Sequence, residues 1–233
     1  MRTLVISDIH GCLDELRALL RQTGYTPGED KLILLGDYVD RGLNSKETVE
    51  EAIRLVNNGA AAIRGNHDQR LADLVRNGGD EVVRKFFEHG GEQTFRSYAG
   101  VPSSDMSLSA FRQLMLTKFA HHLAFLEELP FYIEDDRHIY VHAGLHPDFS
   151  NWKEQPEYNF MYIKEPFLSR PAAVSKTVVF GHTRTADIHG SANIWFGGGK
   201  IGIDGGCAYG MQLNALEIAK DGSYTARHVA RGC

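Results

Sequence analysis

Short apolar runs alternate with helical patterns over the first third of the chain. Residues 32–35 are four consecutive apolar residues, a pattern typical of a strand buried on both faces of a sheet. Shorter runs of the same kind occupy Thr3–Ile6 and 60–63. Apolar residues at helical spacing predict helices over 13–20 and Ser45–Asn57. Repeated strand–helix units imply a parallel sheet with right-handed crossovers.

The pattern becomes helical from about residue 69 to about residue 129, with glycine pairs at 78–79 and 90–91 as breaks. We interpret this insert as a helical cap beside the site, within a single domain over 1–233. Strands return at His138–Val141 and Thr177–Phe180. The tail predicts antiparallel strands over 193–196, 199–203, 212–219 and 224–229, linked by glycine-containing turns.

Composition narrows the protein class. The chain is 42% hydrophobic and 24% charged, as expected of a protein with a sizeable core. Its net charge of −5 makes nucleic acid an unlikely partner, and no apolar run reaches the length of a membrane span. Cys12, Cys207 and Cys233 lack a CxxC spacing, which argues against a disulfide framework. The first apolar run is too short for a signal peptide, so we expect a cytoplasmic protein without a membrane partner.

Five predicted strands each end in a polar cluster, and open α/β sheets bind ligands at that edge. Taken singly, each cluster has a simpler interpretation, such as a polar turn after a core strand. Five of them at equivalent positions favour one shared site. Its candidate members are Asp8, His10, Asp37, Asp40, Asn66, His67, His142 and His182.

The mixture of carboxylate, imidazole and amide ligands favours transition metals, with Mn²⁺ first and Fe or Zn²⁺ as alternatives. Two divalent ions, roughly 3.5–4 Å apart, could share Asp37 as a bridge. Such a pair lowers the pKa of a water to about neutral and clamps the oxygens of an in-line displacement. The neighbouring Arg41 offers a planar fork for phosphate. The sequence therefore predicts direct hydrolysis of a phosphoester by water.

Five segments resemble the motifs of the calcineurin-like metallophosphoesterases, and more narrowly the small bacterial and phage members of the phosphoprotein phosphatase branch. Their order and spacing agree over nearly the whole chain, and the segment at 36–42 is the most specific. The resemblance implies an α/β fold, a four-layer αββα sandwich of two mixed sheets with a small helical cap insert. The matching segments are Asp8-Ile9-His10-Gly11, Gly36-Asp37-Tyr38-Val39-Asp40-Arg41-Gly42, Gly65-Asn66-His67-Asp68, His142-Ala143-Gly144 and Gly181-His182-Thr183.

The resemblance also implies a role for each candidate residue. His67 would be the general acid that protonates the leaving oxygen, oriented by Asp40, and Arg41 would bind the phosphoryl oxygens. The implied ligands are Asp8, His10 and Asp37 for one metal, and Asp37, Asn66, His142 and His182 for the other.

One expected residue is missing. The family has a second phosphate-binding Arg in the loop before the last His-bearing strand, where this chain has Met161-Tyr162-Ile163-Lys164-Glu165. Lys164 stands in its place, and Arg170 is the alternative six residues on. A Lys donates as a point charge without the planar fork of Arg.

Two substrate classes follow from this reaction. Phosphoserine or phosphothreonine in a protein is the favoured one, and symmetrical cleavage of diadenosine tetraphosphate, as by a bis(5′-nucleosyl)-tetraphosphatase, is the alternative. We interpret the aromatics of the 152–170 loop as core packing. The cations of this loop are interleaved with acidic residues, so the loop suits a single phosphoryl pocket better than a polyphosphate. A metal-binding module without catalysis is a further alternative, disfavoured by the intact pair of His67 and Asp40.

Overall fold

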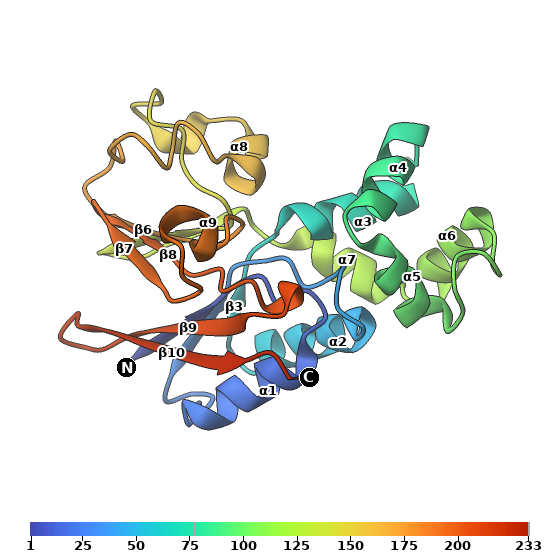
Figure 1. Cartoon of the computed structure of the whole chain (residues 1–233), viewed down its shortest axis with the longest axis horizontal. Coiled ribbons are helices and arrows are strands. Elements are labelled where there is room, and N and C mark those ends of the chain that lie inside the picture. The colour runs from blue at the N-terminus through green and yellow to red at the C-terminus, as the bar shows by residue number, and fades with distance from the viewer. Residues whose placement is uncertain (77, 233) are drawn as a thin grey trace.

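The structure is a computed structural model and describes residues 1–76 and 78–232. Two mixed five-stranded sheets pack against each other (Figure 1). The first has the order β10-β9-β1-β2-β3 and the second β4-β5-β6-β8-β7. The strands of the first are β1 (Thr3–Ile6), β2 (Lys31–Leu34), β3 (Ala61–Ala62), β9 (Gln212–Ile218) and β10 (Tyr224–Ala230). Those of the second are β4 (Tyr132–Glu134), β5 (His138–Val141), β6 (Thr177–Phe180), β7 (Trp195–Gly197) and β8 (Lys200–Gly202).

Helices cover the outer face of each sheet (Figure 1). Apolar residues of α1 (Leu13–Gln22) and α2 (Ser45–Asn57) pack against β1 and β2, whereas α8 (Glu157–Tyr162) and α9 (Thr185–His189) pack against the second sheet. The fold is thus the expected αββα sandwich. The insert adds α3 (Asn66–Arg76), α4 (Asp80–Glu88), α5 (Gly91–Ala99), α6 (Leu108–Thr117) and α7 (Ala120–Glu128). The described residues also include two 3₁₀ turns, η1 (Trp152–Glu154) and η2 (Cys207–Tyr209).

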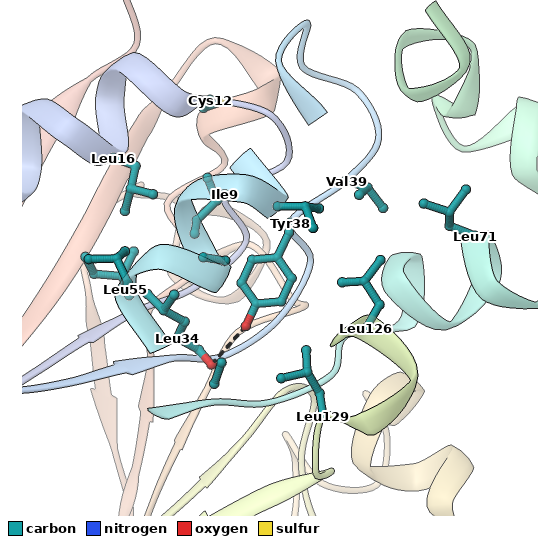
Figure 2. Packing of buried hydrophobic residues seen from close by; sticks show 14 of the residues in the cluster. Ile9, Cys12, Leu16, Leu34, Tyr38, Val39, Leu55, Leu71, Leu126 and Leu129 are labelled. Carbon is teal, nitrogen blue, oxygen red and sulfur yellow. Dashed lines mark hydrogen bonds between the residues drawn. The ribbon is translucent and has the colours of Figure 1, made fainter. Parts of the chain in front are cut away.

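Tyr38 anchors the loop after β2 in the apolar core. Figure 2 shows its ring among side chains of the first sheet, the helices beside it and α7, and it is fully buried. Its hydroxyl donates to the backbone oxygens of Ile63 and Leu34, at 3.0 and 3.4 Å. Burial of a large aromatic side chain stabilises a fold by about 1.5–3 kcal/mol. The polar residues on either side of Tyr38 are therefore fixed by packing.

Most predicted elements are present in the structure. β1, β2 and β3 are parallel, as the repeated strand–helix units indicated, and α2, β5 and β6 have the predicted bounds. The tail contains the predicted antiparallel pairs, β7 with β8 and β9 with β10, and β8 also pairs parallel to β6 after a crossover through α9 and β7. The interpretation of 152–170 as a loop was wrong in part, because η1 and α8 lie there. The insert begins earlier than expected: α3 starts at Asn66, so Asn66 and His67 lie in the first turn of a helix.

Candidate active site

The loops that follow β1, β2 and β6 have an unusual backbone. Several residues other than glycine adopt positive φ angles there, a conformation that costs of order 1–3 kcal/mol each and is characteristic of functional sites. They come from three separate strand ends of both sheets. These residues are Asp8 (52°), His10 (46°), Asp37 (58°), Asp40 (71°), Arg41 (70°) and His182 (62°).

Asp68 holds two of these loops together. Its buried carboxylate accepts the backbone N–H groups of Asp37 at 2.8 Å and of Tyr38 and Gly65 at 2.9 Å. Gly36 is required at the same junction, since its φ is +89° and a Cβ there would strike the backbone of Gly65. Burial, with Asp37 adding to it, raises the pKa of Asp68 to about 7. Sequence reasoning assigned Asp68 no role, although it ends the third motif.

Two histidines turn the same ring nitrogen toward Asp37. His10 and His142 each donate Nδ1–H to a backbone oxygen, of Val39 and Leu35, at 2.7 Å. That bond fixes the tautomer, so each Nε2 lone pair is available to a metal ion. Asp37 Oδ2 lies 3.3 Å from Nε2 of His10 and 3.4 Å from Nε2 of His142. One carboxylate oxygen therefore lies between ligand groups from the two sheets.

Asn66, His182 and Asp8 complete the cluster. Asn66 Oδ1 is 3.0 Å from His142 Nε2 and from His182 Nδ1. The Asp8 carboxylate accepts the backbone N–H of His182 at 3.0 and 3.1 Å and the hydroxyl of Ser7. All six residues predicted from sequence as metal ligands thus lie together at one edge of the sandwich.

The electrostatics suit divalent cations. Burial lowers the pKa of His10 and of His182 well below the usual value, which keeps both imidazoles in the neutral, metal-binding form. Burial opposes ionisation of Asp37, but the neighbouring histidines, His142 first, hold the pKa of that carboxyl well below its usual range. His142 differs from the other two: burial opposes its charged form, but Asp37 raises the pKa of His142 to about 10, so a metal ion bound there would displace a proton from it. Two clusters that share the Asp37 carboxylate form a donor set that fits two divalent ions.

His67 and Asp40 form a buried pair beside this cluster. His67 Nδ1 lies 2.6 Å from Asp40 Oδ2, and Thr94 of α5 donates its hydroxyl to Asp40 Oδ1 at 2.7 Å. Arg70 of α3 also reaches His67 Nδ1, at 3.2 Å. Burial lowers the pKa of His67 well below the usual value and raises that of Asp40 to about 6. The insert therefore positions this pair through Thr94, a residue that belongs to none of the sequence motifs.

Arg41 connects the pair to a cavity of about 300 Å³. Its guanidinium contacts Nε2 of His10 and lies 2.9 Å from Nε2 of His67. The ring of Tyr209, in η2, lies against two guanidinium groups, of Arg41 at 4.9 Å and of Arg184 at 4.4 Å. The cavity is lined by Asp37, Arg41, Asn66, His67, Arg70, His89, Tyr162, Lys164, His182, Arg184, Asp187, Asp204 and Tyr209.

Comparison with known proteins identifies the family. Residues 1–186 match the calcineurin-like phosphoesterases. The chain belongs to this family. The family implies a centre of two divalent metal ions, and the cluster around Asp37 is the candidate for it.

Similar proteins carry related names. This chain is 31% identical over 153 residues to a symmetrical bis(5′-nucleosyl)-tetraphosphatase of Cronobacter sakazakii, a match that covers 64% of this chain and 45% of the relative. The chain thus spans less than half of that relative. An asymmetrical bis(5′-nucleosyl)-tetraphosphatase of Bacillus cereus is 26% identical, with 93% of this chain and 90% of the relative covered. A crystal structure of a candidate diadenosine tetraphosphatase superposes with a TM-score of 0.68, at 26% identity over 99% of this chain and 95% of that chain.

Lys164 and Arg170, the two candidates for the second phosphate-binding residue, lie in different places. Lys164 lines the cavity next to Tyr162 and faces His182. Arg170 lies outside it, in an exposed ion pair with Asp148 at 2.7 Å.

The sequence analysis did not select three further residues that line the cavity, Arg70, Arg184 and His89. Arg70 and Arg184 follow the ligand motifs by a few residues, so their place in sequence was a usable signal. His89 follows α4, and only tertiary folding brings that end of the insert to the site.

Proposed function

We propose that this phosphoesterase hydrolyses dinucleoside tetraphosphates in a Mn²⁺-dependent reaction. The observation that carries the proposal is the number of cationic side chains in the cavity, whose lining also includes the carboxylates of Asp37, Asp187 and Asp204. Four cationic side chains from distant segments line it beside the candidate metal ligands, namely Arg41, Arg70, Lys164 and Arg184. One phosphoryl group needs fewer donors, whereas a chain of four phosphates offers oxygens to all of them. The prediction from sequence counted only the cations of the 152–170 loop, and it therefore underestimated the number of cationic side chains at the site.

The relatives support the same substrate class. Both named above are tetraphosphatases, and the match along nearly the whole chain is with the asymmetrical enzyme. The names of these relatives favour a dinucleotide substrate, the alternative of the sequence analysis, over the phosphoprotein substrate that it favoured. The match with the asymmetrical enzyme also favours cleavage away from the middle of the tetraphosphate.

The proposed division of labour follows the geometry. Asp8, His10 and Asp37 would hold one ion, and Asp37, Asn66, His142 and His182 the other. Bound there, two divalent ions supply an acidified water and withdraw charge from the phosphoryl oxygens. Arg41 orients the phosphoryl group with its fork, and its stacking on Tyr209 limits the directions it can take.

His67 is the proposed acid for the leaving oxygen. Its Nδ1 lies against Asp40, so Nε2 faces the cavity, where it accepts a hydrogen bond from the Arg41 guanidinium. When Arg41 turns to the phosphoryl oxygens, Nε2 is free to take up a proton and to deliver it to the leaving oxygen. Burial opposes the charged form of His67, but an anionic phosphate beside it raises its pKa. Proton donation is thereby coupled to substrate binding.

Product analysis tests the proposal. Purified protein is incubated with diadenosine tetraphosphate and Mn²⁺, with a matched sample in EDTA, and the nucleotides are separated by anion exchange. We expect ATP and AMP with Mn²⁺ and intact substrate with EDTA. Two ADP would keep the substrate class but make cleavage symmetrical. Intact substrate in both samples, with active release of phosphate from a phosphothreonine peptide, would reject the proposal.

A further inference from the structure

An aromatic pair on α8 leads from the metal-ligand cluster to solvent. Tyr158 and Tyr162 lie one helical turn apart, and their rings stack at 4.5 Å with an angle of 11° between planes. Tyr162 lines the cavity, with its ring 6.3 Å from the ring of His182. Tyr158 is 63% exposed. The outer ring of the pair is therefore available to a ligand that reaches the cavity.

Core packing explains the neighbouring aromatics but not Tyr158. Phe160 is 2% exposed and packs against Tyr132, whose ring also contacts Trp152. These side chains fill the space between α8 and the second sheet. Tyr158 points away from them, and its exposed ring forgoes the free energy that burial would supply. The sequence analysis predicted that the aromatics of this segment pack in the core. This prediction is confirmed for Phe160 and wrong for Tyr158.

Cationic side chains line the cavity beside this pair. Lys164 lies two residues beyond Tyr162 and lines the same cavity, as does Arg70 from the facing insert. Tyr209, an exposed tyrosine that lines the cavity, has its ring against the guanidinium groups of Arg41 and Arg184. Tyr158 is stacked only on the cavity side, against Tyr162, among the residues that the structure describes.

We infer that Tyr158 and Tyr162 form a stacking subsite for one nucleobase of the substrate, a specificity element that rests on the proposed function. An aromatic face binds every base with little sequence preference and suits a purine at the end of a polyphosphate. The base would extend the stack beyond Tyr158, while the phosphates run inward past Lys164 to the metal-ligand cluster.

The test separates the base from the phosphates. KM is measured for diadenosine tetraphosphate, and the inhibition constant is measured for inorganic tripolyphosphate, which carries the charge but no base. Tyr158→Ala should raise the KM of the dinucleotide about tenfold, within the range known for removal of a base-stacking aromatic. The inhibition constant of tripolyphosphate should rise by a much smaller factor. Tyr158→Trp, which retains a stacking face, should restore the KM. Tyr224→Ala, a partly exposed tyrosine of β10, is the matched control.

Each other outcome has a definite meaning. Equal weakening of the dinucleotide and of tripolyphosphate would overturn the stacking subsite and assign Tyr158 a structural role. An unchanged KM in Tyr158→Ala, with active wild-type protein, would also overturn it. Wild-type protein without activity on the dinucleotide would instead reject the proposed function itself.

Discussion

The cavity has a floor and a rim that are built in different ways. The floor consists of Asp37, Asn66 and His67, with His142 hydrogen-bonded behind Asn66, and each of these residues is at most 4% exposed. The rim consists of Lys164, Arg184 and Tyr209, and we count with it Tyr158, which stacks on the cavity residue Tyr162. The rim residues lie on short helices and loops, and Tyr158 is 63% and Tyr209 50% exposed. A buried, preorganised floor suits a reaction that many substrates share. A solvent-exposed rim suits the choice among them, because its contacts can change without disturbing the core.

The largest effect is expected from a change in the floor, where the Asp37 carboxylate is shared by both sets of candidate metal ligands. We expect Asp37→Asn to reduce hydrolysis nearly to the level of the uncatalysed control, because Asp37 lies between both sets of candidate ligands. Activity and metal content, the latter by inductively coupled plasma mass spectrometry, check this. Wild-type turnover with unchanged metal content would contradict a shared, two-metal floor.

His67→Asn should lower turnover by roughly 10²–10⁴-fold, the usual range for loss of a general acid or base. The loss should be smaller for nitrophenyl phosphate, whose leaving group barely needs a proton. Metal content should be preserved, since the His67 imidazole pairs with Asp40 and is not a proposed metal ligand. Equal losses for alkyl and aryl esters would show that His67 does not protonate the leaving group.

The rim should respond in a substrate-dependent way. Arg184→Ala should raise the KM for diadenosine tetraphosphate by about three- to tenfold, the range for a charged hydrogen bond weakened by solvent. Asp187→Ala should act in the opposite direction, because Asp187 pairs with the Arg184 guanidinium at 3.0 Å and competes with phosphate for it. Parallel effects of the two variants on KM would exclude a phosphate-binding role for Arg184.

The smallest effects should distinguish Lys164 from Arg170. Lys164→Ala should raise KM severalfold, whereas Lys164→Arg should keep or improve it, because Arg supplies a planar fork at the same position. Arg170→Ala is the matched control, and its KM should equal that of wild type because Arg170 pairs with Asp148 outside the cavity. A silent Lys164→Ala with an impaired Arg170→Ala would reverse the assignment.

The difference between floor and rim also explains what the sequence could predict. Floor residues such as Asp37 and Asn66 follow strands directly, so local apolar patterns place them at one sheet edge. Thr94, by contrast, reaches Asp40 from a helix fifty-four positions away in the chain, and no local pattern reports such a contact. The exposure of Tyr158 beside the buried Phe160 depends on how α8 docks on the second sheet. The missed features are therefore tertiary ones, and they bear on the substrate more than on the reaction.

The most direct test of a general floor with a dinucleotide-selecting rim is a ratio of kcat/KM values. Diadenosine tetraphosphate and a phosphothreonine peptide are compared with the wild-type protein at the same Mn²⁺ concentration. We predict that the dinucleotide is preferred by at least about tenfold, which corresponds to about 1.4 kcal/mol of transition-state discrimination. A tenfold preference for the peptide would contradict this prediction and would instead support a protein phosphatase activity.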